Sequence, residues 1–423
     1  MHSSPFRALA HYRTLPALVG RGPLLVAFLA RAPYAMVPLG AMTAFTASTG
    51  SVAQGGLATG ITSISTAVAS PLIGRWADRR GQRFVLMALT PVNAVALALL
   101  FLAALLGWTG PLQWGICLAA GATCLPIGSF TRARWVARVP GPRELAAAFS
   151  YESMADELVF VLGPALVGIA ASVAAPAAPL ALAVCLVVVA GIPFALAAPG
   201  PDTRPGAPDS PGVPAPGTSP AHPTRPRIGT VLAAVLPSVV VMVCIGSFFG
   251  TVQAGTTERA ELLGSPGSAG LVYALMGLGS GVMALMVVLV PERITLPARV
   301  AAGGLGMGVL ITVVSLQSSL GTTALALLAA GTFVGPTMVT AFSLAERLAP
   351  EGGISVAMTS MQSAVTVGVS LGSSLGGVLA AAHGPEGAFA VGMVVSACIC
   401  LCGTAMVVAR GRRRRSPEPS FPG

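Results

Sequence analysis

The stretch of sequence that decides the fold reads Gly74-Arg75-Trp76-Ala77-Asp78-Arg79-Arg80-Gly81-Gln82-Arg83. It places four arginines and one aspartate between two long segments that carry no charge. Short loops rich in arginine stay on the cytoplasmic side of a membrane, because Arg and Lys in such loops set the orientation of the neighbouring helices. The stretch therefore predicts two membrane helices joined by a tight cytoplasmic loop.

The composition of the whole chain agrees with a lipid environment. The mean hydropathy is +0.82, and 54% of the residues are hydrophobic against 9% charged. A soluble globule with a polar surface is excluded by these values. The net charge of +10 comes entirely from arginines, which are divided into small groups between apolar runs. A nucleic-acid-binding protein would gather them on one folded face, so we expect no nucleic-acid partner.

Apolar runs long enough to cross a bilayer as helices recur about twelve times along the chain. Their continuity differs from the alternating pattern of a membrane barrel. The sequence therefore predicts an all-α membrane protein with about twelve transmembrane helices in two pseudo-symmetric six-helix halves. The predicted spans are 24–47, 54–74, 84–106, 112–131, 149–173, 179–198, 229–254, 268–290, 296–316, 320–344, 354–381 and 388–409.

The arginines lie almost entirely in every second connection between these runs, which predicts that both termini are cytoplasmic. Among the outer connections, only the one after Ala254 carries an arginine, Arg259, which we expect Glu258 and Glu261 to offset. The segment between the two halves is rich in Pro, Gly and Ser, which is typical of a disordered linker. The predicted parts are the cytoplasmic N-terminus 1–23, the N-terminal half 24–198, the linker 199–228, the C-terminal half 229–409 and the basic tail 410–423.

Weak internal similarity supports two related halves. The segment that begins with Leu371 and Gly372 in the eleventh run lies over the one that begins with Leu162 and Gly163 in the fifth. Such parallel repeats are typical of secondary transporters built from two half-bundles.

The basic loop also carries a spaced motif, made of Gly74, Asp78, Arg79, Gly81 and Arg83. This pattern resembles the loop between helices two and three of the major facilitator superfamily of secondary transporters. The resemblance implies that Asp78 and Arg79 belong to a gate that contacts the other half, and Gly81 suits a tight turn. Gln82 departs from the family pattern, which usually has a second basic residue there. The alternative is that Asp78 only offsets the arginines of an orienting loop.

Three carboxylates lie in the inner part of the fifth run: Glu152, Asp156 and Glu157. Glu152 and Asp156 are four residues apart and share one helix face. An ionised carboxylate inside a membrane is costly and usually faces a cavity or a partner. The partner that we expect is Arg31, which lies inside the first run. The family resemblance makes the first and fifth helices neighbours, which implies that Arg31 reaches Asp156 or Glu157.

Two interpretations of this group remain open. In one, Asp156 or Glu157 exchanges a proton during transport. In the other, Arg31 and a carboxylate form an ion pair that only holds the half together, because buried pairs perturb ionisation for structural reasons as well. The residues do not decide between Asp156 and Glu157.

The fifth run continues with Gly163 and Pro164, followed by Gly168. These residues partly match the glycine and proline motif that resembles helix five of proton antiporters in the same family. Independently of the resemblance, a proline frees a backbone carbonyl and a glycine permits close approach, so this helix is expected to bend or to pack tightly there.

No enzyme chemistry is predicted. The seven cysteines lie within spans, the four histidines lie in termini or loops, and the glycine-rich runs lack a following lysine. The sequence therefore indicates neither a metal site nor a cofactor.

These observations predict a transporter in a plasma membrane, with a small-molecule substrate, protons and the lipid bilayer as partners, and with the monomer as its working form. The uniform use of arginine together with abundant Ala, Gly, Pro and Val suggests a GC-rich bacterial genome. The favoured function is export of a hydrophobic or weakly polar drug or metabolite by proton antiport. The alternative is a proton-coupled uptake symporter for a sugar or small metabolite. A non-transporting receptor or a membrane enzyme fits less well.

Overall fold

The computed structural model describes residues 19–139, 141–198, 226–265, 268–291 and 293–415. Within these ranges all regular structure is helical, and twelve helices are long and apolar enough to cross a membrane. The predicted fold class and number of spans are thereby confirmed. The predicted linker is described only at its last residues, from Pro226, and most of the N-terminal segment lies outside the described residues, as does the end of the tail beyond Arg415.

The first half of the chain provides six spans. They are α2 (Arg21–Thr49), α3 (Val52–Arg80), α4 (Gln82–Leu105), the pair α5 (Pro111–Ala122) and α6 (Ile127–Arg138), α7 (Pro142–Val173), and the series α8 (Ala178–Leu186), η1 (Val187–Gly191) and α9 (Ile192–Leu196). The second half provides α10 (Ile228–Leu262), α11 (Ala269–Met286) with η3 (Val287–Leu289), α12 (Leu296–Ser315), α13 (Leu320–Leu348), α14 (Ile354–His383) and α15 (Pro385–Arg415).

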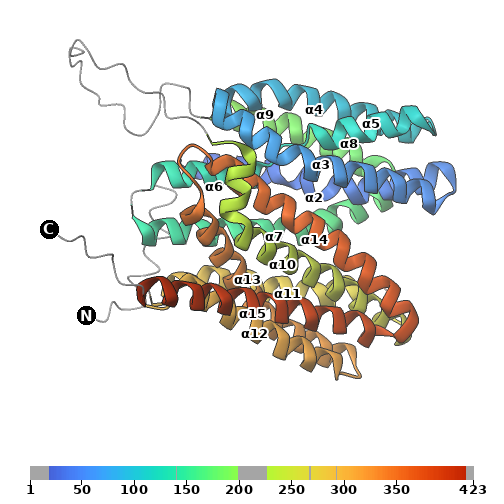
Figure 1. The fold of residues 1–423 in the computed structure, drawn as a ribbon. Helices are drawn as coiled ribbons and strands as arrows, with labels where there is room; N and C mark the ends of the chain where they lie inside the picture. The colour runs from blue at the N-terminus through green and yellow to red at the C-terminus, as the bar shows by residue number, and fades with distance from the viewer. Residues whose placement is uncertain (1–18, 140, 199–225, 266–267, 292, 416–423) are drawn as a thin grey trace, which may run out of the picture.

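The helices run roughly side by side in two groups, one from each half (Figure 1). We call the end of the bundle where α2 begins and α15 ends the basic end, because the α3–α4 turn with its arginines lies there too. Apolar side chains such as Ile64, Leu271 and Val378 point outward and are more than 60% exposed. Such a surface suits contact with lipid, whereas the backbone polar groups are satisfied within the helices.

The fourth span is broken. α5 ends at Ala122 and α6 begins at Ile127, and the connecting residues include Cys124 and Pro126. Pro126 has no N–H to continue the helical ladder and constrains the residue before it. The break restarts a helix within the span, so the N-terminus of α6 lies inside the bundle.

A close contact between two helices at a glycine occurs in each half. A Cβ added at Gly163 of α7 would lie 2.8 Å from Cβ of Ala35 on α2, and one added at Gly372 of α14 would overlap the backbone of Ser247 on α10. In each half the fifth helix therefore meets the first helix at the aligned glycine. This contact is the structural counterpart of the internal sequence similarity.

Arg259 lies on α10, at the end away from the basic end, and connects α10 with α12 and α15. Its guanidinium donates to the carbonyl oxygens of Val314 at 2.7 Å and Ser315 at 3.0 Å, and it pairs with Glu386 at 3.1 Å. The side chain is buried against the ring of Phe389. The side chain turns inward and satisfies the last carbonyls of α12.

Candidate functional site

A cluster of four charged side chains lies inside the first half. Arg31 comes from α2, Arg132 from α6, and Glu152 and Asp156 from α7. Their exposed fractions are 4%, 0%, 1% and 8%. Two cations and two anions in one buried group leave no net charge, which is the usual condition for tolerating charges away from water.

Glu152 has a complete set of partners. Its carboxylate pairs with Nη2 of Arg31 and accepts from Oγ1 of Thr131 at 2.6 Å and from Nε1 of Trp135 at 2.7 Å. Arg31 also donates to Thr131 at 2.6 Å. These charge-assisted bonds tie the inner parts of α2, α6 and α7 together.

Asp156 lies one turn further along α7 and has two ion-pair contacts. Its Oδ2 lies 2.8 Å from Nη2 of Arg132, and its Oδ1 lies 3.6 Å from Nη1 of Arg31. The carboxylate faces the beginning of α6, where a Cβ on Gly128 would come within 3.0 Å of Oδ1. The broken fourth span therefore brings a helix start, with its favourable dipole, next to this aspartate.

Arg132 was missed as a site residue. The sequence places it in a basic loop after a span that ends near Thr131, but α6 continues to Arg138 and buries Arg132 completely. The guanidinium carbon lies 3.7 Å from the centre of the Phe342 ring on α13, in the other half. A helix can extend into such a charged stretch because the buried arginine is compensated by Asp156.

The other residues predicted to matter in helix five differ in what the structure describes of them. The side chains of Glu157 and Pro164 lie outside the described part of the structure. Gly163 makes the close contact with Ala35, whereas Gly168 is exposed and a Cβ there would meet nothing within 4 Å. Gly163 therefore lies at a packing contact and Gly168 does not.

The loop motif meets the other half at the basic end. Both oxygens of the Asp78 carboxylate accept hydrogen bonds at 3.2 Å from the backbone N–H groups of Ser355 and Val356, at the start of α14. A Cβ added at Gly74, one turn earlier, would overlap Oγ1 of Thr359 on the same helix. Gly81 ends α3 with a φ of 85°, a conformation that favours glycine.

The last part of the loop turns toward the first half. Gln82, at the position where the family pattern is broken, accepts from Nε of Arg134 at 2.9 Å, and the guanidinium of Arg134 stacks over the ring of Phe194 at 4.0 Å. Arg79 and Arg83 are exposed at the end of α3 and the start of α4. A second arginine at position 82 would face Arg134, so the departure from the pattern has a local physical reason.

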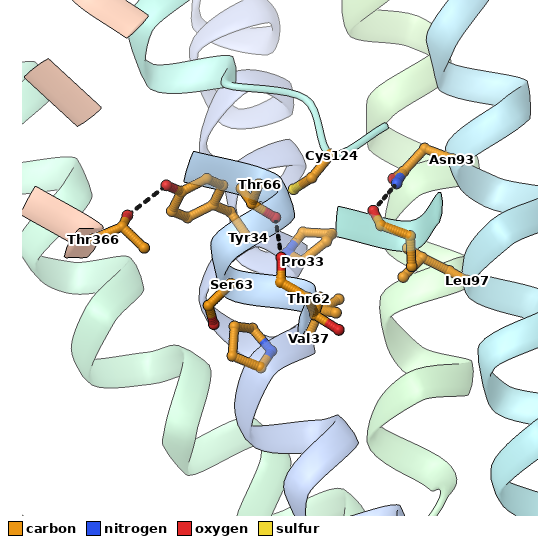
Figure 2. A pocket seen from close by; sticks show the side chains of 12 residues that line it. Pro33, Tyr34, Val37, Thr62, Ser63, Thr66, Asn93, Leu97, Cys124 and Thr366 are labelled. Atoms are coloured by element: carbon orange, nitrogen blue, oxygen red, sulfur yellow. Dashed lines mark hydrogen bonds between the residues drawn. The ribbon is translucent and has the colours of Figure 1, made fainter. Parts of the chain in front are cut away.

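Other polar contacts between the halves lie nearby or midway along the helices. Ser129 of α6 donates to the carbonyl oxygen of Met358 at 3.0 Å. The hydroxyls of Tyr34 on α2 and Thr366 on α14 are 2.7 Å apart (Figure 2). Figure 1 shows the two groups of helices diverging toward the end opposite the basic end.

Two small pockets flank Tyr34. The first, shown in Figure 2, is lined by apolar and hydroxyl-bearing side chains, among them Val37, Ser63 and Thr66. The second borders Asp156, Arg31 and Gln362 of α14, together with the break before α6. Asp156 thus lies on a pocket that both halves of the protein line. The described residues contain no group of three or more His, Cys, Asp or Glu side chains able to hold a metal ion.

Comparisons with known proteins agree with this arrangement. A family model described as the Major Facilitator Superfamily matches residues 24–351, and no curated protein matches the sequence. A bacterial homologue of the iron transporter ferroportin, in an outward-facing state, is similar over 91% of this chain and 98% of its own, with a TM-score of 0.68 and 14% identity.

Two further solved structures share the fold. The human organic anion transporter MFSD10 is 16% identical, with a TM-score of 0.64 over 95% of this chain and 100% of its own. The transporter FucP, in the outward conformation, is 13% identical, with a TM-score of 0.63 over 95% of this chain and 98% of its own. At these identities the likeness concerns the fold alone.

Proposed function

Because the chain belongs to the Major Facilitator Superfamily, we propose that it is a secondary active transporter that exports a small hydrophobic or weakly polar compound by proton antiport. Transport, rather than catalysis, follows from the family and from the transporters that share its fold. The observation that carries the proton-coupling proposal is the position of Asp156, a buried carboxylate on a pocket lined by Tyr34 of one half and Gln362 of the other.

The proposed orientation has the basic end in the cytoplasm of a bacterial cell, with both termini inside. The support is the concentration of arginine in the connections at that end. In this orientation the contacts of Asp78, Gly74 and Ser129 with α14 close the cytoplasmic side. The conformation is then outward-facing, and the loop motif acts as the cytoplasmic gate.

The proposed proton carrier is Asp156 rather than Glu152. Glu152 has three hydrogen-bond donors and borders a pocket that the first half alone lines, whereas Asp156 borders the pocket that both halves line and is held by ion pairs at 2.8 and 3.6 Å. A group that exchanges a proton needs access to water and must lose its stabilisation at small cost. Arg31 and Glu152 then form the structural pair, and Asp156 titrates. Glu157 remains a second proposed carrier.

The proposed substrate binds near the pockets around Tyr34. Val37, Pro33 and Leu97 provide apolar walls, and Thr62, Ser63 and Thr366 provide hydroxyl groups. Apolar walls with a few placed polar groups suit a weakly polar molecule better than one with several charges. One chain contains both halves, so a monomer is the proposed working form.

The test is directional transport. A screen of a deletion strain for compounds to which it becomes sensitive supplies the substrate. Everted membrane vesicles with an acidified interior should then accumulate that compound, and an ionophore that collapses the proton gradient should release it. Vesicles containing the Asp156→Asn protein should not accumulate it.

The second candidate is proton-coupled uptake, and it would use the same pocket and the same aspartate. Accumulation by intact cells, abolished by the ionophore and absent from everted vesicles, would replace the export proposal with symport.

Orientation is tested separately by reporter fusions. A reporter near Gly212 or at the C-terminus should report cytoplasm, and one near Gly110 should report the exterior.

A further inference from the structure

We propose that Arg132 transmits the charge state of Asp156 to the interface between the two halves, by holding its guanidinium against the ring of Phe342 only while Asp156 is ionised. The inference rests on the proposed proton coupling at Asp156. It adds a residue that positions the gate, on a helix where the sequence indicated a loop.

The geometry joins the two halves through one side chain. Arg132 is completely buried, with Nη2 2.8 Å from Oδ2 of Asp156 on one side and the Phe342 ring 3.7 Å away on the other. Among the described residues, Asp156 is the anion that pairs with Arg132. The guanidinium also donates a long hydrogen bond from Nη1 to the carbonyl oxygen of Gly128 at 3.4 Å. Phe342 is itself only 1% exposed.

The consequence follows from charge balance. With Asp156 ionised, the cluster of Arg31, Arg132, Glu152 and Asp156 is neutral. When Asp156 takes up a proton, one positive charge is left over in a buried interface. Arg31 keeps its bond to Glu152, so Arg132 is the cation that loses its partner.

An aromatic face stabilises a desolvated cation only in part, and an unpaired buried charge is strongly unfavourable. Separation of α6 from α13 would admit water to the guanidinium and relieve this cost. Protonation of Asp156 therefore favours opening at the basic end, and loss of the proton favours the closed arrangement seen here. This direction of the effect suits a transport cycle in which the proton binds from the opposite end and leaves at the basic end.

No other described group around Asp156 is placed to lose its charge partner when Asp156 is protonated. From α2, Arg31 is committed to Glu152, and Tyr34 is neutral, as is Gln362 of α14. Glu152 on the same helix has its own donors. α11 carries no charged residue, and on α13 the half-buried Glu346 interacts with its neighbour Arg347.

The experiment measures closure of the basic end directly. Spin labels replace Arg138, at the end of α6, and Glu351, before α14, both of which are exposed. The background protein has its seven native cysteines replaced. The distance between the labels in lipid nanodiscs reports the ratio of open to closed protein as the pH is varied.

The wild-type pair should shift from the short to the long distance as the pH falls. Asp156→Asn should show the long distance at every pH, because it leaves Arg132 unpaired. Asp156→Asn with Arg132→Met should return to the short distance at every pH, since the unpaired charge is gone. If the double variant stays open, Arg132 is not the transmitting residue and the inference is wrong.

A second series keeps the inference testable if Asp156→Asn folds poorly. Phe342 is replaced by phenylalanines with increasing numbers of ring fluorines, which weaken the attraction for a cation with little change in volume. The ratio of open to closed protein at high pH should rise stepwise, by roughly tenfold in total, which is the size expected for a desolvated cation–ring contact. An unchanged ratio across the series would show that the ring only fills space.

Failure of the proposed function gives a different result. If the protein is not proton-coupled through Asp156, the wild-type distance does not change with pH, whatever the fluorine series does. If coupling exists but bypasses Arg132, the wild-type distance changes with pH and the double variant remains open. Monodisperse elution of each variant in detergent is the control for folding.

Discussion

The carboxylate of Asp78 accepts a hydrogen bond from the backbone N–H of Ser355 at 3.2 Å, across the boundary between the two halves. Its second oxygen accepts from the next residue of the same helix start. A carboxylate at a helix N-terminus also interacts favourably with the helix dipole. The basic end is thus closed by the type of contact that caps a helix, with the acceptor supplied by a different half of the protein.

The first prediction concerns this cap. Asp78→Asn removes the charge and one of the two equivalent acceptors, which should cost the closed state about 1 kcal/mol and slow transport. The readout is reactivity of a cysteine at Ser355, a position only 3% exposed in the closed arrangement, toward a thiol reagent added at the basic end, in protein without other cysteines. Arg80→Gln, at a variable position of the same loop, is the matched control and should behave as the wild type. Equal reactivity in all three proteins would return the motif to a role in orientation alone.

The second prediction concerns the space between α3 and α14. Gly74→Ala should prevent full closure, because the new Cβ would overlap Oγ1 of Thr359 and lie 2.8 Å from the carbonyl oxygen of Ser355. Gly60→Ala on the same helix is the control, since a Cβ there meets nothing within 4 Å. Transport should fall in the first variant and not in the second. A fully active Gly74→Ala protein would mean that α14 moves aside freely.

The third prediction tests the contact of the first and fifth helices. Gly163→Ala should destabilise the protein by about 1–3 kcal/mol, a typical cost of inserting a methyl group into a tight contact, whereas Gly168→Ala should be neutral. The midpoint of thermal unfolding in detergent is the measurement. Ala35→Gly should restore the stability of Gly163→Ala, because it removes the atom that the new methyl group meets. Absence of that rescue would place the strain elsewhere.

The fourth prediction separates a structural ion pair from a proton carrier. Glu152→Gln or Arg31→Met alone should destabilise the protein by several kcal/mol, because each leaves a buried charge without its partner. The double variant should recover most of the stability and retain proton-driven transport. Both values are measured on the same purified proteins. Stable double-variant protein without proton-driven transport would assign the coupling to this pair instead of to Asp156.

The sequence predicted the fold well, because apolar runs of membrane length and a charge bias between alternate loops are local signals that depend on the solvent rather than on distant contacts. The family resemblance implied that Arg31 reaches Asp156 or Glu157. In the structure Arg31 pairs most closely with Glu152, and Asp156 lies 3.6 Å from it.

Three features of the site could not be predicted in this way. The sequence places Arg132 in a loop, because the apolar run before it is already long enough to cross the membrane. Its burial depends on Asp156 and on Phe342, which lies 210 positions later in the chain. The N–H groups that Asp78 binds are backbone atoms and leave no residue signature. The break in the fourth span carried a signal in Pro126, but proline is tolerated in many membrane helices, as Pro33 and Pro38 within α2 show.

The central claim is that one buried carboxylate, Asp156, takes up and releases the coupling proton. Difference infrared spectroscopy of the protein in lipid, recorded as the pH is stepped, measures the carbonyl stretching band of a protonated carboxyl group without any knowledge of the substrate. We expect one such band to grow as the pH falls, to be missing in Asp156→Asn, and to persist in Glu152→Gln. Persistence of the band in Asp156→Asn, or its loss in Glu152→Gln alone, would contradict the account.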